Sequence, residues 1–326
     1  MVGVRGLVEA GIPERGMGFE SEEVWGRGGL ALRSADMVVA AVPHMVGFPP
    51  EDSVVLVGLA RESADGPSTV RLVQRFDTPD EQPPGEVTSR VAGDAAAPMV
   101  RAGVSEVVVV VFGSTVPDAD RELPAASLVD ELVVSLEEGD VAVRDAVYTD
   151  GSSRWSYGCD DPSCCPPEGR LIPDEARTLV AAEFAAHGAA MASSRQSLTD
   201  EIAPDPGASE VREAAAVAVD STPTTPTELE AWRDDRITET THVLASGGDA
   251  GALSRSIAGL RDIRVRDTIL WEMTQHAGRQ QPAIDALSAM VRCVPDGQVA
   301  PTATMLAVAQ WMAGEGARAN AALARA

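Results

Sequence analysis

The sequence predicts an α/β fold in its first half, with a mixed sheet in a three-layer arrangement, followed by an all-α helical C-terminal region. Three observations predict it. Residues 106–113, EVVVVVFG, form an uninterrupted apolar run that is typical of a strand buried on both faces. Two other β-branched runs, at 53–60 and 69–77, precede it and predict a hairpin. No long β-branched run follows residue 180, so the remainder is expected to be helical.

A helix is expected at the start of the α/β region. The hydroxyl of Ser34 can cap it, and Asp36 in the first turn favours the positive end of the helix dipole. The helical pattern continues to Val46. Because Pro43 has no backbone N–H, it is expected to end or kink this helix.

Helical and extended stretches alternate after the hairpin. Residues 84–102 are Ala-rich and typical of a helix, and a second helix is expected at 121–138. A strand at 141–150 and a short strand after the following turn complete the series. A hairpin followed by β-α-β units predicts a mixed sheet with helices on both faces.

The second half of the chain alternates helical segments with segments rich in Pro, Ser and Thr. A helix is expected from Asp174 to about Met191, and linker-like stretches follow at 204–208 and 220–227. Further helices are expected at 228–245, 250–258, 265–276, 282–292, 302–313 and 315–325. The expected domains are a disordered N-terminal arm at 1–28, an α/β domain at 30–194, a Pro/Ser/Thr-rich linker at 195–227 and a helical domain at 228–326.

The net charge of the chain limits the classes of molecule that it is expected to bind. The chain has 50 acidic and 26 basic residues and a net charge of −24, and every basic residue is arginine because the chain has no lysine. An acidic surface repels phosphate groups, so we expect neither nucleic acid nor an anionic membrane as a partner. A protein or a small molecule is the expected partner.

Hydropathy and cysteine usage indicate a cytoplasmic protein. No apolar run reaches the roughly 18 residues of a membrane span, and the N-terminus lacks the apolar core of a signal peptide. Three of the four cysteines lie within seven residues, unlike the spread framework of a secreted disulfide scaffold. The thiols are therefore expected to be reduced.

The most informative stretch is 154–169, RWSYGCDDPSCCPPEG, called the cysteine loop below. It combines Trp155, Tyr157, Cys159, Cys164 and Cys165 in one polar, proline-stiffened segment. Ordinary connections carry Gly, Asn and Ser, whereas these residue types are usually buried. Such a loop is expected to hold thiols and aromatic rings in fixed positions.

The three thiols could bind structural zinc, form a disulfide or redox switch, or remain reduced and packed. Structural zinc normally takes four ligands from two separated knuckles, but only three thiols are local and no histidine is near. A disulfide or redox switch between Cys159 and Cys164 lacks a neighbouring basic residue that would lower a thiol pKa. Reduced, packed thiols are favoured. On this basis no metal and no cofactor are expected.

Polar residues gather at one predicted end of the sheet. Ser53 begins a strand, and Arg75 and Asp77 share a face of the next one by the two-residue period. Ser114 lies in the loop after the valine strand, where ligands bind in open α/β sheets. These residues predict either a polar site or, as we favour, strand-end capping with a surface ion pair.

Several enzyme classes are excluded by missing residues. A chain without lysine cannot contain a Walker lysine, form a lysine Schiff base or hold pyridoxal phosphate in the usual way. Its four histidines stand in no H-E-x-x-H motif, and no G-x-S-x-G elbow is present. No catalytic residue is therefore assigned.

Four segments together resemble the actinobacterial domain of unknown function 4192 family. They are LRSADMVVAAVPHMVGFPPEDSVVLVGL (32–59), RFDTP (75–79), the cysteine loop (154–169) and WMAGEGARANAAL (311–323). The cysteine loop is the most specific of the four. The resemblance covers nearly the whole chain from Leu30 onward and implies an actinobacterial, cytoplasmic protein. It implies no activity.

The function expected from these observations is a non-catalytic module that binds a ligand or a protein. The alternative is a small-molecule enzyme whose site lies at the carboxyl ends of the strands, near the cysteine loop. The candidate ligand-binding residues are Ser53, Arg75, Asp77, Ser114, Arg154, Trp155, Tyr157, Cys159, Cys164 and Cys165.

Overall fold

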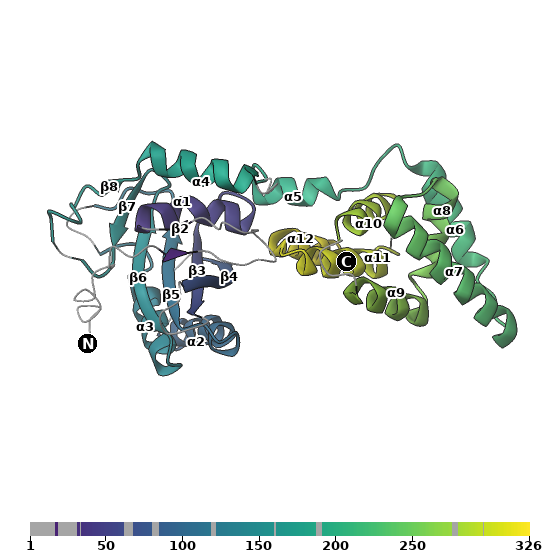
Figure 1. The fold of residues 1–326 in the computed structure, drawn as a ribbon, viewed down its shortest axis with the longest axis horizontal. Coiled ribbons are helices and arrows are strands. Elements are labelled where there is room, and N and C mark those ends of the chain that lie inside the picture. Colours follow the sequence, from purple (N-terminus) through teal and green to yellow (C-terminus); the bar gives the residue numbers. More distant parts are fainter. Residues whose placement is uncertain are drawn as a thin grey trace. The chain divides into compact units, whose positions relative to one another are not determined.

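The chain divides into two compact units, Met1–Met191 and Ala192–Ala326, which are described separately (Figure 1). The structure is a computed structural model. It describes residues 17–18, 31–32, 34–61, 68–79, 85–118, 122–159, 161–186, 191–275, 280–295 and 297–326.

A mixed six-stranded sheet forms the centre of the first unit, in the order β4-β3-β5-β6-β7-β8. Its strands are β3 (Ser53–Arg61), β4 (Ser68–Asp77), β5 (Glu106–Phe112), β6 (Ala142–Thr149), β7 (Ser153–Ser156) and β8 (Arg170–Leu171). The predicted hairpin is confirmed, because β3 and β4 pair antiparallel, and β5 and β6 form the parallel pair of a β-α-β unit. The remaining neighbours pair antiparallel.

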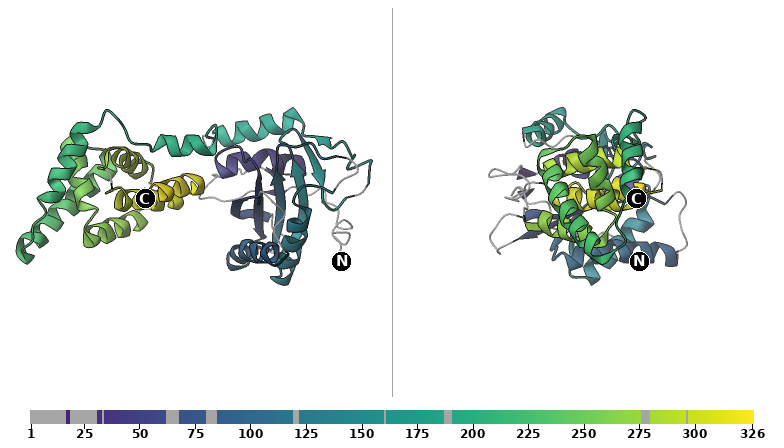
Figure 2. Two further views of the ribbon diagram at one scale, coloured as in Figure 1. Left: turned by 180° about the vertical axis from the view of Figure 1, so that it is seen from behind. Right: turned by 90° about the vertical axis from the view of Figure 1, so that its right-hand side faces the viewer.

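Helices cover both faces of this sheet and confirm the three-layer prediction. On one face lie α1 (Ala35–Val46) and α4 (Asp174–Ala186), and on the other α2 (Gly85–Arg101) and α3 (Ala126–Glu138), as Figure 2 shows from two further directions. The valine run supplies both cores. Its odd-numbered valines, 107, 109 and 111, pack toward α2 and α3, while 108 and 110 pack toward α1 and α4.

The first helix begins where the sequence predicts. Ser34 caps it by accepting a hydrogen bond from the backbone N–H of Met37 at 3.3 Å. Pro43 lies inside α1 instead of ending it, and the helix stops at Gly47, whose φ of 90° suits a residue without a Cβ. The proline is tolerated because it sits in the last turn, where few later hydrogen bonds depend on it.

The expected disorder of residues 1–28 lies mostly outside the described residues. Within that range the structure describes β1 (Met17–Gly18), which pairs antiparallel with β2 (Ala31–Leu32) in a separate two-stranded sheet. These two residues therefore differ from the expectation, because they hydrogen-bond to a partner strand.

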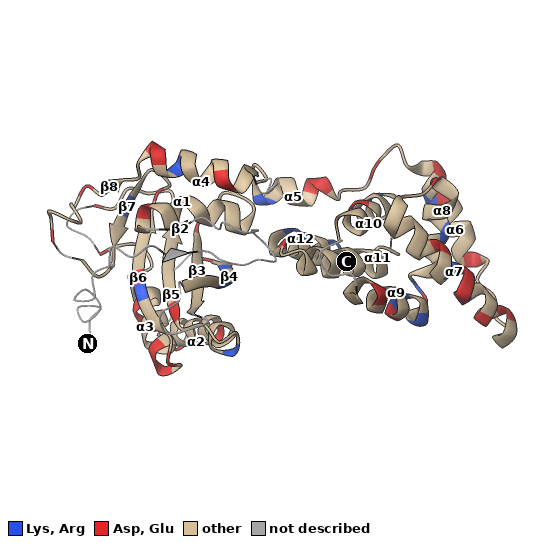
Figure 3. Cartoon of the chain, in the orientation of Figure 1, with Lys and Arg blue, Asp and Glu red and all other residues tan. Residues whose placement is uncertain are grey.

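The second unit is helical, as predicted. Its helices are α5 (Arg195–Glu201), α6 (Ser209–Asp220), α7 (Pro226–Ser246), α8 (Ala250–Gly259), α9 (Ile263–Gln275), α10 (Gln281–Cys293), α11 (Ala300–Met312) and α12 (Gly316–Arg325). They surround one apolar core that includes the fully buried Leu287, Met290 and Leu306. Acidic residues recur along α7 (Figure 3). Two of them, Glu230 and Glu239, form ion pairs with arginines of the same unit.

The expected linker at 195–227 is different in the structure. It contains α5 and α6, and both belong to the helical unit. The small side chain of Ala215 on α6 is fully buried in the helical core, and the backbone N–H of Asp205 donates to the carbonyl of Arg292 at 2.9 Å. The prolines and the single glycine of this stretch mark turns between helices, so composition alone was misleading.

Within the described residues, none of the helices has both the length and the apolarity that crossing a bilayer requires.

Candidate functional site

The cysteine loop begins in β7 and leads to the edge strand β8, and Trp155 anchors it. Trp155 is buried, and its indole N–H donates to the carbonyl oxygen of Pro167 at 3.0 Å. Gly169 closes the loop with a φ of 84°. A Cβ there would lie 2.5 Å from the indole ring, so both the backbone angle and the close approach require glycine.

Tyr157 is the second anchor. Its backbone N–H donates to the carbonyl of Ala146 at 3.0 Å, which extends the pairing with β6 beyond the end of β7. Its hydroxyl donates to the carbonyl oxygen of Pro124, just before α3, and burial raises the pKa of this phenol well above its usual range. The two aromatic residues thus hold one side of the loop against the sheet and the start of α3.

A tight turn then places the vicinal cysteines. The carboxylate of Asp161 accepts hydrogen bonds from the backbone N–H and the hydroxyl of Ser163, at 2.9 and 2.8 Å, and these bonds lower the pKa of Asp161. The carbonyl oxygen of Asp161 accepts from the N–H groups of Cys164 and Cys165, at 3.1 and 2.7 Å. Both thiols are therefore carried by a backbone with local hydrogen bonds of its own.

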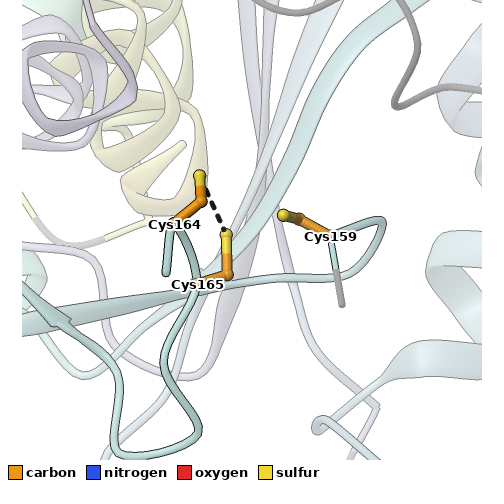
Figure 4. Close-up of side chains that lie close together, drawn as sticks. All are labelled: Cys159, Cys164 and Cys165. Carbon is orange, nitrogen blue, oxygen red and sulfur yellow. Dashed lines mark hydrogen bonds between the residues drawn. The ribbon is translucent and has the colours of Figure 1, made fainter. Parts of the chain in front are cut away.

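The three thiols of the loop converge. The sulfur atoms of Cys159, Cys164 and Cys165 all lie within 4.8 Å of one another, and those of Cys164 and Cys165 are 3.7 Å apart (Figure 4). Two sulfurs bound tetrahedrally to zinc at about 2.3 Å are about 3.8 Å apart, so this spacing suits a shared metal ion. Soft ions such as Zn²⁺ and Cu⁺ are the ions that thiolates prefer.

The exposure of these thiols differs from that of core residues. Cys164 is exposed, and Cys159 and Cys165 are partly exposed. Fully packed thiols would be buried among apolar side chains, which is the usual state of a structural cysteine. Burial raises the pKa of the Cys165 thiol, and so do its hydrogen bonds with the sulfur atoms of its two neighbours, because the thiol of Cys165 donates to Cys164 and thereby keeps its proton.

The polar residues at the sheet end form a separate group. The guanidinium of Arg75 donates twice to the hydroxyl oxygen of Ser53, at 2.9 and 2.6 Å, and forms an ion pair with Asp77. It also lies over the ring of Phe48, 5.7 Å from its centre. The predicted Arg75–Asp77 pair is therefore present, in a cluster whose members satisfy one another.

The loop after β5 is linked to the cysteine loop by packed aromatic rings. The hydroxyl of Tyr148 donates to the carbonyl of Thr115 at 2.7 Å, and its ring centre lies 5.8 Å from that of Trp155. Both rings are buried. Ser114 is exposed in the same loop. The connection between the two loops is thus a packed contact between side chains.

Arg154 belongs to neither the thiol group nor the Arg75 group. Adjacent strand residues point to opposite faces, so Arg154 faces α1 while Trp155 faces α2 and α3. Its guanidinium forms an ion pair with Asp36 of α1, and both side chains are about nine-tenths buried, with 11% and 10% exposed. Burial raises the pKa of nearby Asp145, while the positive charge of Arg154 acts in the opposite direction.

Sequence reasoning did not connect Asp36 or Asp145 with Arg154. The signal available was a pair of charged residues, Arg144 and Asp145, inside an otherwise apolar strand. The register of β6 shifts at this point, which places Asp145 opposite Val108 and on the α1 side of the sheet. The two-residue alternation of side chains along a strand does not reveal from the sequence where its register with the neighbouring strand shifts.

The comparison with protein families gives one match, to a domain of unknown function, DUF4192, over residues 36–326. The chain belongs to this family. The match includes the cysteine loop and all of the helical unit, and it confirms the resemblance that the sequence motifs indicated. The comparisons with curated proteins and with solved structures returned no match.

Proposed function

We propose that this member of the DUF4192 family is a non-catalytic cytoplasmic binding module whose cysteine loop binds a thiophilic metal ion. The observation that carries the proposal is the convergence of the sulfur atoms of Cys159, Cys164 and Cys165 within 4.8 Å. Three sulfur donors at this spacing match the needs of a d¹⁰ ion such as Zn²⁺. Reduced thiols of this kind fit a cytoplasmic protein.

The alternative is a small-molecule enzyme at the carboxyl ends of the strands. Ser53, Arg75 and Asp77 would supply its polar groups, but these three bond to one another at the sheet end. Arg154 is likewise engaged by Asp36. Groups that already satisfy each other stabilise a strand end, whereas a catalytic site needs groups aimed at a substrate. The geometry therefore supports a binding role more than catalysis.

Metal titration of the full chain tests the proposal. Zn²⁺ is titrated into the reduced protein in competition with a chromophoric chelator, and we expect one tightly held ion per chain. The variant that combines Cys159→Ser, Cys164→Ser and Cys165→Ser is expected to lose this ion, because a neutral serine hydroxyl is a poor ligand for soft metals.

Cys293→Ser is the matched control, because Cys293 is the remaining cysteine and belongs to the helical unit. It is expected to bind Zn²⁺ as the parent protein does. Equal zinc binding by the parent and the triple variant would show that the loop thiols are not the ligands.

A further inference from the structure

We propose that the metal ion on the cysteine loop is held by three protein thiolates and keeps a fourth coordination position open to an external, uncharged donor. This inference rests on the proposed function and names the geometry and the second ligand of the same site. Structural zinc sites are closed by four protein ligands, whereas sites that accept an external ligand have three.

The loop offers three protein ligands to a metal ion. Within the described part of the chain, three side chains converge here that could act as metal ligands, and all three are cysteines. No described His, Asp or Glu belongs to this group. Among the described residues, the nearest carboxylate along the loop is that of Asp161, which is engaged by the N–H and hydroxyl of Ser163. Three thiolates therefore leave one corner of a tetrahedron for a ligand from outside the loop.

The three thiols are accessible from solvent. Cys164 is exposed, and the two other thiols are partly exposed. Figure 4 shows the side chains of Cys164 and Cys165 on one segment of the loop, with that of Cys159 facing them from the opposite segment. An ion shared by these sulfurs lies at the surface of the unit, where a small molecule or a partner's side chain can reach it.

The loop is preorganised for metal binding. The loop is held by bonds that involve no thiol: Trp155 to Pro167, Tyr157 to Pro124, and the turn at Asp161. A structural zinc site contributes the folding free energy of its loop, and such loops unfold when the metal is removed. Here the described parts of the loop backbone are held by bonds that need no metal, so the ion acts as a ligand of the protein.

Charge selects the kind of external donor. Three thiolates and one divalent cation carry a net charge of −1, and the exposed carboxylates of Asp161 and Glu168 lie in the same loop. The flanking arginines 154 and 170 are paired in register, so both point to the sheet face opposite Trp155. An anion is therefore disfavoured at the fourth position, and an imidazole or another neutral nitrogen donor is favoured.

Cobalt spectroscopy on the full chain tests this inference. Co²⁺ replaces Zn²⁺ in thiolate sites, and its visible d–d bands report the ligand set. The protein is loaded with one equivalent of Co²⁺ and titrated with imidazole, or with sodium chloride at the same concentrations. We expect imidazole to shift the d–d bands in a saturable manner, with the sulfur-to-cobalt charge-transfer band retained, and chloride to have at least tenfold weaker effect.

Three outcomes would overturn the inference, and they are distinguishable. Unchanged d–d bands at saturating imidazole, with the charge-transfer band present, would mean that the site is closed while the proposed metal binding stands. A changed starting spectrum in the variant Asp160→Asn would identify Asp160 as a fourth protein ligand. Absence of any charge-transfer band would remove the proposed function itself, and the open position with it.

Discussion

At the scale of single residues, the pair Asp36–Arg154 is a buried charge interaction of the α/β unit. It joins the first turn of α1 to β7, and its two side chains are only 10% and 11% exposed. Removing one partner of a buried ion pair leaves the other charge without compensation, which costs more than the pair contributes.

We therefore expect Asp36→Ala to lower the free energy of unfolding by about 3–5 kcal/mol, measured by urea denaturation with far-UV circular dichroism. Asp36→Leu combined with Arg154→Met and Asp145→Asn is the control, because it replaces the pair by apolar side chains of similar volume and also removes the buried charge on which Arg154 acts. This combined variant is expected to recover most of the loss. A single variant as stable as the parent would show that Asp145 or solvent compensates Arg154 without Asp36.

At the scale of elements, the cysteine loop separates two tasks. Its aromatic anchors fix the backbone, and its thiols are the ligands in the proposed metal site. Trp155 buries a large ring against the sheet and bonds to Pro167, while the exposed Cys164 contributes little packing. Folding and binding can therefore be altered independently by substitutions only a few residues apart.

This separation predicts different effects on the metal-free protein. Trp155→Ala is expected to lower the free energy of unfolding by about 3–5 kcal/mol, because it removes a buried aromatic side chain. The triple cysteine-to-serine variant is expected to change it by about 1 kcal/mol or less, because the thiols are partly exposed and the loop is held by other bonds. Chemical denaturation in the presence of a chelator measures both. A large loss in the triple variant would make the thiols part of the fold.

At the scale of the whole molecule, each unit has its own apolar cores. The clusters of the α/β unit draw on residues 32–184, and the cluster of the helical unit draws on residues 202–322. Because each core is built from one continuous part of the chain, each unit is expected to unfold as a cooperative unit of its own.

Leu287→Ala tests this independence, since Leu287 is fully buried in the helical core. A cavity at this site is expected to cost the helical unit about 2–5 kcal/mol. In a background where Trp232, Trp271 and Trp311 of the helical unit are replaced by phenylalanine, near-UV circular dichroism of the buried Tyr148–Trp155 contact reports on the α/β unit and should retain its transition. A matched change in that signal would mean that the two units unfold together.

Much of the fold was predictable from local patterns. The valine run of β5, the hairpin of β3 and β4 and six of the C-terminal helices lie within a few residues of their predicted places. Each depends on periodicity, which a single segment carries by itself. The helices at 195–201 and 209–220 were missed because the prolines and the glycine in the turns around them imitate a linker, while the contacts that stabilise the helices come from distant segments.

The fold class and the family could be recognised from the sequence alone, and the cysteine loop could be selected as a candidate site, because strand runs, motifs and residue types are local properties. Which of the candidate residues contact one another became clear from the three-dimensional structure. It brought three thiols within 4.8 Å, paired Arg75 with Ser53 and Asp77, and sent Arg154 across the sheet to Asp36. The physical reason is that turn geometry, strand register and the face of the sheet are set by contacts between residues far apart in the chain.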